Sequence, residues 1–382
     1  MKATRRIRET NADSRHRFPL VVMTSPDPNW LLEIPSSDPA ILLRYRDRQY
    51  AAELIATAIL KFDFFTHLGK HPGSTRQQLC EHFGWHVRPA DVLLTLCRAS
   101  DLIQTDGMGR CTLTPTGSDF LRSDGAHFMG PYYRPLADSP IVAGFERVLK
   151  TGKPANWQAK SDGADWHESM LDPDFAREFT ELMNCRGTAF GKCLAQAIES
   201  DLGSRRRLLD VGGGSGIYAA TLVARCPHLR ATVLEQPPVD QIASSELDRL
   251  GLSSRIDVMS GDMFDDPWVT GTPDGRPDVV LFSNVLHDWD QAEAEVLIQK
   301  ASEALEPGGL LVIHGAILRA DKTGPLPVAE YSALLMNITQ GKCYSEAEYG
   351  EMLQSAGLVP EPYRGTIGDR GVMTALKPSS SR

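Results

Sequence analysis

One glycine-rich segment, Leu208-Leu-Asp-Val-Gly-Gly-Gly-Ser-Gly, constrains the fold of this chain more than any other part of its sequence. The apolar residues up to Val211 predict a short buried strand, and the glycines after it allow a tight turn whose backbone a ligand can approach. The helix expected next points its N-terminal amides at the same space. Further strand-like segments alternate with helical sequence at 231–235, 256–260, 278–283 and 310–314. This alternation predicts a parallel sheet with right-handed crossovers, which makes a doubly wound α/β domain.

The spacing of glycines and carboxylates predicts which ligand this turn binds. Glu235, at the end of the second strand, can accept hydrogen bonds from both hydroxyls of a ribose. Gly212, Gly214 and Gly216 follow G-x-G-x-G rather than the G-x-G-x-x-G of pyrophosphate-binding turns. A carboxylate at Asp210 repels phosphate and suits the cationic ammonium of a methionine. The pattern therefore favours S-adenosylmethionine over a dinucleotide, and the alternative is a glycine turn that binds no ligand.

The third strand ends at Gly261-Asp-Met-Phe, which extends the same site. A carboxylate at Asp262 is placed to hydrogen-bond the amino group of adenine, while Met263 would pack on the ring. The alternative for Asp262 is a turn residue or a helix cap, which explains an aspartate at this place equally well.

Composition and charge exclude several classes of protein. The 382 residues are enough for two domains, and a net charge of −9 argues against a surface that binds nucleic acid or anionic lipid. No apolar run approaches the roughly 18 residues that a membrane helix needs. Seven cysteines without CxxC or histidine-rich spacing fit reduced thiols and indicate no metal site. We expect a cytoplasmic protein that acts without a metal, a membrane or nucleic acid.

The first half of the chain is predicted to be helical, with apolar residues at helical spacing from 51 to 60. Ser74 is a candidate helix cap, since a glutamine follows three residues later. After a helix at 88–97, residues 102–113 read as two short strands around a glycine-containing turn. Helices followed by such a hairpin are typical of a winged helix. The helix at 88–97 is apolar with few basic residues, so it suits protein contact better than the DNA-binding alternative.

Taken together, these motifs resemble the class I methyltransferases, specifically the O-methyltransferase family of plant caffeic acid and acetylserotonin enzymes and their bacterial relatives. The most specific segments are Phe282-Ser-Asn-Val-Leu-His-Asp-Trp-Asp and Leu305-Glu-Pro-Gly-Gly-Leu-Leu-Val-Ile, beside the glycine turn and Gly261-Asp-Met-Phe. The resemblance implies a winged-helix domain that forms a homodimer, followed by a Rossmann-like domain that holds S-adenosylmethionine. We expect a flexible arm at 1–29, the dimerisation domain at 30–135, pocket helices at 136–200 and the methyltransferase domain at 201–382.

The resemblance also assigns residues to the cofactor, whose product is S-adenosylhomocysteine. By position, Glu235 binds the ribose, Gln236 covers the adenine, and Trp289 packs near the cofactor. Ser283 stands where the plant enzymes have a lysine near the cofactor. The predicted cofactor residues are Asp210, Gly212, Gly214, Glu235, Gln236, Asp262, Met263, Ser283 and Trp289.

His287 falls where the family keeps its general base. A histidine fits that role because it titrates near neutral pH and can take a proton from a hydroxyl within hydrogen-bond reach. The two acidic residues that orient this histidine in plant enzymes are replaced here by Gly315 and Cys343. His314, Asp288 or a carboxylate on the substrate are candidate replacements. Because these acidic residues are absent, carbon or nitrogen methylation and a reaction without methyl transfer remain alternatives to O-methylation.

Two helical segments are predicted to line the acceptor pocket. Apolar and methionine-rich walls suit a flat aromatic or polyketide-like molecule, although ordinary core packing explains many of these positions equally well. The predicted substrate residues are Phe179, Met183, Asn184, Asp288, Tyr331, Leu334, Leu335 and Ile338. The sequence thus predicts an S-adenosylmethionine-dependent O-methyltransferase that acts on small metabolites.

Overall fold

The structure is a computed structural model that describes residues 28–155, 169–268 and 275–379. Residues 1–27 of the predicted arm therefore lie outside the described residues. The described residues from Leu31 onward form one compact unit. None of the helices in the described ranges is long and apolar enough to cross a membrane.

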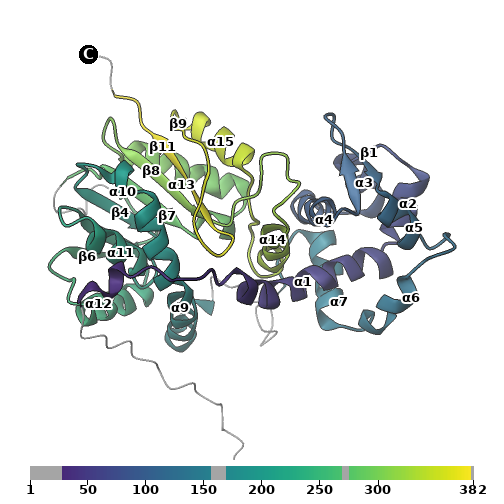
Figure 1. Cartoon of the computed structure of the whole chain (residues 1–382), viewed down its shortest axis with the longest axis horizontal. Coiled ribbons are helices and arrows are strands. Elements are labelled where there is room, and N and C mark those ends of the chain that lie inside the picture. The colour runs from purple at the N-terminus through teal and green to yellow at the C-terminus, as the bar shows by residue number, and fades with distance from the viewer. Residues whose placement is uncertain (1–27, 156–168, 269–274, 380–382) are drawn as a thin grey trace, which may run out of the picture. The chain divides into compact units, whose positions relative to one another are not determined.

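The N-terminal part consists of helices around a small antiparallel sheet (Figure 1). The sheet has the order β1-β3-β2, with β1 at Ser74–Thr75, β2 at Ile103–Thr105 and β3 at Arg110–Leu113. The two strands predicted within 102–113 are thereby confirmed. The helices are η1 (Pro28–Leu32), α1 (Ala40–Leu60), α2 (Phe64–Lys70), α3 (Arg76–Phe83), α4 (Val87–Ala99), α5 (Pro115–Phe120), α6 (Gly130–Tyr133), η2 (Arg134–Leu136) and α7 (Pro140–Thr151).

The cap of α3 lies one residue later than predicted. The Thr75 hydroxyl accepts a hydrogen bond from the Gln78 N–H, and the Gln78 side chain accepts one from the Thr75 N–H at 2.8 Å. Ser74 and Gln77 have the same spacing as Thr75 and Gln78, so the sequence fits both pairs. Ser74 instead pairs with Cys111 in the small sheet, which takes it out of the helix start.

The C-terminal part is an α/β sheet with the order β10-β11-β8-β7-β4-β5-β6, and β9 pairs with β11. The neighbouring strands β8, β7, β4, β5 and β6 run parallel, as predicted. Strand β11 pairs with β8 in the antiparallel sense, which makes the sheet mixed. The strands are β4 (Arg207–Val211), β5 (Arg230–Glu235), β6 (Ile256–Ser260), β7 (Val279–Ser283), β8 (Leu310–Gly315), β9 (Val359–Pro360), β10 (Arg364–Gly365) and β11 (Gly371–Leu376).

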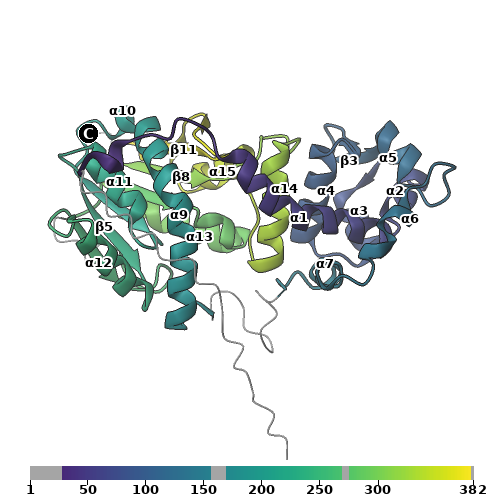
Figure 2. The ribbon, with the colours of Figure 1, turned by 60° about the horizontal axis from the view of Figure 1, so that its bottom comes forward.

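Helices connect these strands and cover the sheet (Figure 2). One face of the sheet, including Leu209, Phe282 and Ile313, packs on α13 (Gln291–Ala304) and α15 (Glu346–Ser355). The central strand β4 has β5 on one side and β7 on the other, so the chain reverses its direction of winding beside β4. Ligands bind at such a switch point, outside the carboxyl ends of the strands. The remaining helices are α9 (Pro173–Ala197), α10 (Glu199–Leu202), α11 (Ile217–Arg225), α12 (Val239–Arg249), η4 (Leu286–Asp288) and α14 (Leu326–Ile338).

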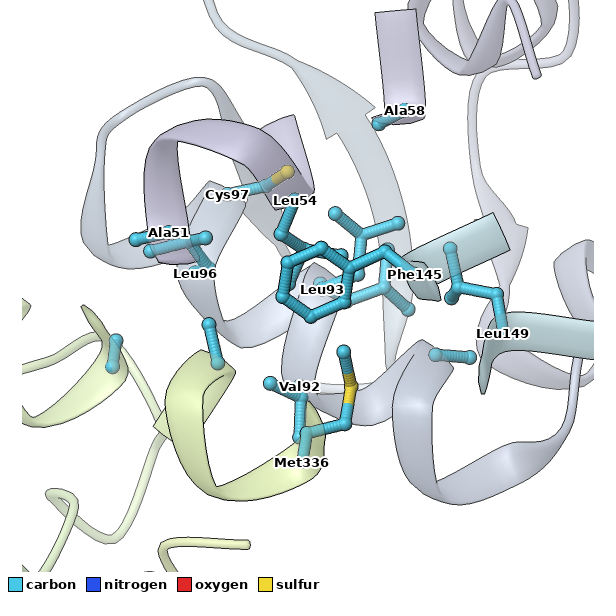
Figure 3. Close-up of a cluster of buried hydrophobic side chains, with 14 of the residues drawn as sticks. Ala51, Leu54, Ala58, Val92, Leu93, Leu96, Cys97, Phe145, Leu149 and Met336 are labelled. Carbon is cyan, nitrogen blue, oxygen red and sulfur yellow. The ribbon is translucent and has the colours of Figure 1, made fainter. Parts of the chain in front are cut away.

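Helix α14 belongs to the C-terminal half in sequence but packs in the N-terminal core. Met336 lies in one buried cluster with Leu54 of α1, Leu93 of α4 and Phe145 of α7 (Figure 3). The segment after α14 is fixed by hydrogen bonds, because Arg88 donates to the carbonyl oxygens of Met336, Thr339 and Gly341 at 3.3, 3.3 and 2.8 Å. Burial of this apolar helix joins the two halves of the chain through a single core.

A buried ion-pair network strengthens the same junction. The Asp91 carboxylate of α4 lies 2.8 Å from Lys322 Nζ and 2.5 Å from Lys342 Nζ. Both lysines also contact Glu348 of α15, at 2.7 and 2.5 Å. Asp91 is buried and also pairs with Arg76 at 2.8 Å, so three cations compensate its charge, and removal of Asp91 would leave the buried Lys342 with Glu348 alone.

Candidate active site

A cavity opens at the carboxyl ends of β4, β5 and β7, with walls from α9 and α14. Its floor is the glycine turn, from which Gly212, Gly213 and Gly214 line the cavity. A second cavity adjoins it and shares Glu235, Met263 and further residues of its wall. The fold therefore brings α9, the carboxyl ends of three strands and α14 together around the two adjoining cavities.

Most of the predicted cofactor residues line these two cavities. Those that line the first are Gly212, Gly214, Glu235, Gln236, Met263, Ser283 and Trp289. Asp262 lines the second cavity, where Gly212, Glu235, Gln236, Met263 and Trp289 recur. The sequence motifs thus converge in space, although they are up to 77 residues apart along the chain, from Gly212 to Trp289.

Asp210 is the exception, because it lines neither cavity. Its side chain is fully buried, and a Cβ built on Gly213 would lie 2.7 Å from Asp210 Oδ2. The carboxyl group thus lies beneath the glycine turn, and burial raises its pKa to about 7. Because the carboxyl group of Asp210 lines neither cavity, its predicted contact with a methionine ammonium stays a prediction. The physical reason for its position is the alternation of a strand, which turns Leu209 and Val211 toward α13 and Asp210 toward the other face.

Glu235 occupies the wall between the two cavities. Its Oε1 accepts a hydrogen bond from the Gly214 N–H at 2.8 Å, and its Oε2 accepts one from the Gln236 N–H at 3.2 Å. Gly214 has a φ of +60°, which glycine adopts without strain, and a Cβ built there would contact nothing within 4 Å. Burial raises the pKa of Glu235 to about 7 despite these two bonds. A carboxylate held in this way suits hydroxyl donors that approach from the cavity.

Asp262 is a turn residue that also lines the second cavity. Its Oδ1 accepts hydrogen bonds from the N–H groups of Phe264 and Asp265 at 2.7 and 3.1 Å, as expected of a turn residue. The residue also lines the second cavity, so it is available at the predicted adenine position. Trp289 packs edge-on against Phe264 with ring centroids 4.6 Å apart, which fixes an aromatic wall beside it.

His287 lies in η4, directly after β7, and lines the first cavity. It is 4% exposed, and its Nε2 lies 3.8 Å from Asp288 Oδ1. Burial, together with the positive charges of Arg370 and Arg186, holds the pKa of His287 well below its ordinary value. The imidazole is therefore neutral and able to accept a proton at physiological pH.

The surroundings of His287 confirm that position 315 faces it. A Cβ built on Gly315 would lie 3.6 Å from His287 Nδ1, so an acidic side chain there would reach the ring. The candidate replacement His314 is fully buried and lies 2.8 Å from Ser283 Oγ through its Nδ1. That contact links His314 to the cofactor side of the site through Ser283.

All predicted substrate residues line the first cavity. They are Phe179, Met183, Asn184, Asp288, Tyr331, Leu334, Leu335 and Ile338. Asn184 accepts a hydrogen bond from the Ser215 hydroxyl at 2.5 Å, so it holds α9 against the glycine turn. The ring of Tyr331 lies edge-on to His287 with centroids 5.8 Å apart. Within the described ranges, no group of three or more side chains is suited to hold a metal ion.

Sequence reasoning missed several polar residues of this cavity. Arg186, Tyr218 and Asn284 line it, and Asn284 donates a hydrogen bond to the Tyr218 hydroxyl at 3.0 Å. Arg186 follows Met183 by three residues in one helix, so the helical period places both on the same face. That spacing was the available signal. Nothing in the sequence indicated Arg370, which reaches Tyr331 from the end of the chain.

Comparison with known proteins adds independent information about this site. Residues 146–359 match the O-methyltransferase domain family. The chain is 31% identical over 304 residues to the 3-hydroxy-5-methyl-1-naphthoate 3-O-methyltransferase of Streptomyces sahachiroi, which covers 78% of this chain and 85% of that protein. It is 27% identical to the L-tyrosine C(3)-methyltransferase of Streptomyces lavendulae, over 80% of this chain and 83% of that protein. A solved structure of an O-methyltransferase family 2 protein from Planctomyces limnophilus, in complex with apigenin, matches with a TM-score of 0.79 and 28% identity, over 91% of this chain and 98% of that one.

Proposed function

Since the chain belongs to the O-methyltransferase family, we propose that it transfers a methyl group from S-adenosylmethionine to a hydroxyl of a small aromatic or polyketide-like metabolite. The observation that carries this proposal is the cavity that has Glu235 and the glycine turn on one side and His287 on another. The naphthoate O-methyltransferase and the apigenin complex both support oxygen as the acceptor atom. They favour it over carbon or nitrogen methylation and over a reaction without methyl transfer.

The residues present fit S-adenosylmethionine. The Gly212–Gly214 turn lines the cavity, and the Glu235 carboxyl group lines both cavities, where it could accept hydrogen bonds from the ribose hydroxyls. Asp262, Met263 and Trp289 would hold the adenine in the second cavity. When bound, the cofactor would supply an electrophilic methyl group on a sulfonium, whose carbon–sulfur bond breaks as the acceptor oxygen bonds to the methyl carbon in line, with S-adenosylhomocysteine as the leaving group.

His287 would serve as the general base of the reaction. Its neutral imidazole would accept the proton of the acceptor hydroxyl, while Tyr331 and Met183 hold the aromatic part of the acceptor. A base whose pKa is strongly lowered is weak, so this site suits an acceptor whose hydroxyl is itself acidic.

We further propose that the N-terminal part, within 30–135, is a winged-helix domain through which the enzyme forms a homodimer. The small antiparallel sheet with α3 and α4 beside it supports the first point. Exposed apolar side chains at Ile41, Leu42 and Tyr132 support the second. The pocket helices would occupy 136–200 and the methyltransferase domain 201–382. All seven cysteines are free thiols, which supports a cytoplasmic location.

Substitution of Glu235 tests cofactor binding. Glu235→Ala removes the hydrogen-bond acceptor between the two cavities, and we expect the Kd for S-adenosylhomocysteine to rise about 10- to 100-fold, as for the loss of a charge-assisted hydrogen bond. Isothermal titration calorimetry measures the effect. Glu295→Ala, at an exposed position of α13, is the matched control and should leave the Kd unchanged. An unchanged affinity in Glu235→Ala would contradict the assigned cofactor site.

The identity of the methylated atom is tested by the product. Reactions with S-adenosylmethionine carrying a ¹³C-methyl group and a panel of hydroxynaphthoates and flavonoids should yield products whose label resonates as a methoxy carbon. Label attached to a ring carbon or to nitrogen would contradict O-methylation and support carbon or nitrogen methylation instead. Absence of labelled product from every acceptor, while the cofactor still binds, would favour a reaction without methyl transfer.

The pH dependence of turnover tests the state of His287. Because its pKa lies well below 6.5, protonation of His287 should not limit the rate near neutral pH. We expect the midpoint of the rate–pH curve to move with the acceptor, when two acceptors are compared whose hydroxyl pKa values differ by about two units. A midpoint that stays near 6.5 for both acceptors would show that His287 itself titrates there and that its environment is different.

A further inference from the structure

Arg186 brings a positive charge into the cavity without a carboxylate to balance it. Its guanidinium lies on the cavity wall, 3.4 and 3.5 Å from the Tyr331 hydroxyl and 3.0 Å from the Met183 sulfur. A phenol oxygen at this distance and a thioether are weak acceptors. Among the described residues, no aspartate or glutamate forms an ion pair with Arg186. The guanidinium thus keeps most of its capacity to bind an anion.

The acidic groups of this region are paired with other arginines or are only partly ionised at neutral pH. Asp47 forms an ion pair with Arg46 at 3.1 Å, and Glu330 forms one with Arg44 at 3.2 Å. Asp288 lines the same cavity, but burial raises its pKa to about 7. The charge of Asp47 also helps to raise the pKa of Arg186, but among the described residues no carboxylate forms an ion pair with its guanidinium.

A second arginine makes this end of the cavity more positive. The Arg370 guanidinium lies over the Tyr331 ring, 4.4 Å from its centroid, and Arg370 is 3% exposed. Within the described part of the chain, its Nε and one Nη have no hydrogen-bond partner. His287, which lines the same cavity as Arg186, has a pKa well below its ordinary value and is neutral. Two arginines and a neutral histidine leave a net positive charge in a place that water solvates poorly.

We infer that Arg186 binds a carboxylate in the reacting complex, and this inference rests on the proposed function. A planar guanidinium binds a carboxylate through two parallel hydrogen bonds, and burial strengthens them. Two carboxylates can reach the cavity, one on an aromatic hydroxy acid that serves as acceptor and one on the methionine part of the cofactor. Either would balance the charge of Arg186 and reduce the field that keeps His287 weakly basic.

Two pairs of ligands separate these sources by titration calorimetry. The acceptor pair is 3-hydroxy-1-naphthoate and 3-hydroxy-1-naphthamide, each titrated into the wild type in the presence of S-adenosylhomocysteine. The cofactor pair is S-adenosylhomocysteine and its decarboxylated analogue, S-adenosyl-3-thiopropylamine. In at least one pair we expect the carboxylate to bind about 10- to 100-fold more tightly in the wild type. Arg186→Met should abolish that preference.

The control substitution is made on the same helix. Arg177→Met changes an exposed arginine of α9 whose partner is Asp174, and it should keep the full preference. If Arg186→Met loses the preference for the carboxylate in the acceptor pair, the carboxylate that Arg186 binds is on the acceptor. If the variant loses it in the cofactor pair, the carboxylate is on the cofactor. The inference is overturned if the wild type shows no preference in either pair, or if Arg186→Met retains the preference.

The outcome also separates this inference from the proposed function. If S-adenosylhomocysteine binds and methylated product forms while neither carboxylate matters, only the role of Arg186 is wrong. If the wild type fails to bind S-adenosylhomocysteine at all, the proposed function fails first. The comparison of two ligands on the wild type requires no variant, so a wild type without either preference overturns the inference even if Arg186→Met folds poorly.

Discussion

Replacement of His287 by alanine is expected to lower the rate of methyl transfer by about 10²- to 10⁴-fold, the range for loss of a general base. The imidazole is buried at the cavity wall and is held neutral, so it can take the proton that the acceptor hydroxyl loses. Single-turnover measurements with saturating S-adenosylmethionine report the chemical step separately from product release. The Kd for S-adenosylhomocysteine should stay unchanged, because the predicted cofactor contacts come from other residues.

A surface histidine provides the control for this substitution. His228→Ala changes an exposed side chain after α11 and should leave both rate and affinity unaltered. If His287→Ala retained full O-methylation, the base would have to be another group, or the acceptor would enter already ionised. The pH–rate curve of the variant then distinguishes the two, because only an ionised acceptor would give the wild-type curve.

Replacement of Gly341 by alanine is expected to destabilise the fold by about 3 kcal/mol, the upper part of the usual range for overpacking. A Cβ at this position would lie 2.0 Å from the His287 carbonyl oxygen and 2.7 Å from that of Trp289. Both atoms belong to the backbone of the η4 turn, so a change of side-chain rotamer cannot relieve the contact. Urea unfolding followed by circular dichroism measures the loss.

A glycine-to-alanine substitution without a steric clash is the control for Gly341→Ala. Gly350→Ala lies within α15, where a built Cβ contacts nothing within 4 Å. It should stabilise the helix by about 0.5–1 kcal/mol because alanine is a better helix former than glycine. If Gly341→Ala were as stable as Gly350→Ala, the close approach of Gly341 to η4 would be wrong. Partial destabilisation with a large loss of turnover would indicate that His287 has moved.

The cofactor motifs could be predicted because they are local. Gly212, Gly214 and Glu235 follow buried strands, and adjacent parallel strands end at one edge of a sheet, so their meeting follows from strand order. The glycine motif does not report on which side of β4 Asp210 lies, because the alternation along the strand decides it, and its contact with the cofactor stays a prediction. The prediction that Gly315 stands where an acidic residue would reach His287 agrees with the 3.6 Å between a Cβ built on Gly315 and His287 Nδ1.

The charges around the acceptor could not be predicted in the same way. Arg186 and Arg370 meet Tyr331 from opposite ends of the C-terminal half, and only the packing of α9, α14 and β11 brings them together. Gly341 likewise reads as an ordinary turn residue, and its contact with η4 depends on tertiary structure. The antiparallel pairing of β11 with β8 was missed because an apolar strand has no sequence signal for direction.

The position of α14 sets where this chain can be recombined with its relatives. An exchange of residues 40–151 alone would place foreign side chains of α1, α4 and α7 against Met336 and its neighbours, which evolved with the native set. The same exchange would replace residue 91, so that a segment without an aspartate there would leave Lys342 with only one of its two carboxylate partners, Glu348. A functional chimera therefore has to exchange residues 326–342 together with residues 40–151, because the two segments share one core. Acceptor-pocket residues of α14 move with these segments, so exchange of the N-terminal half changes acceptor selectivity as well.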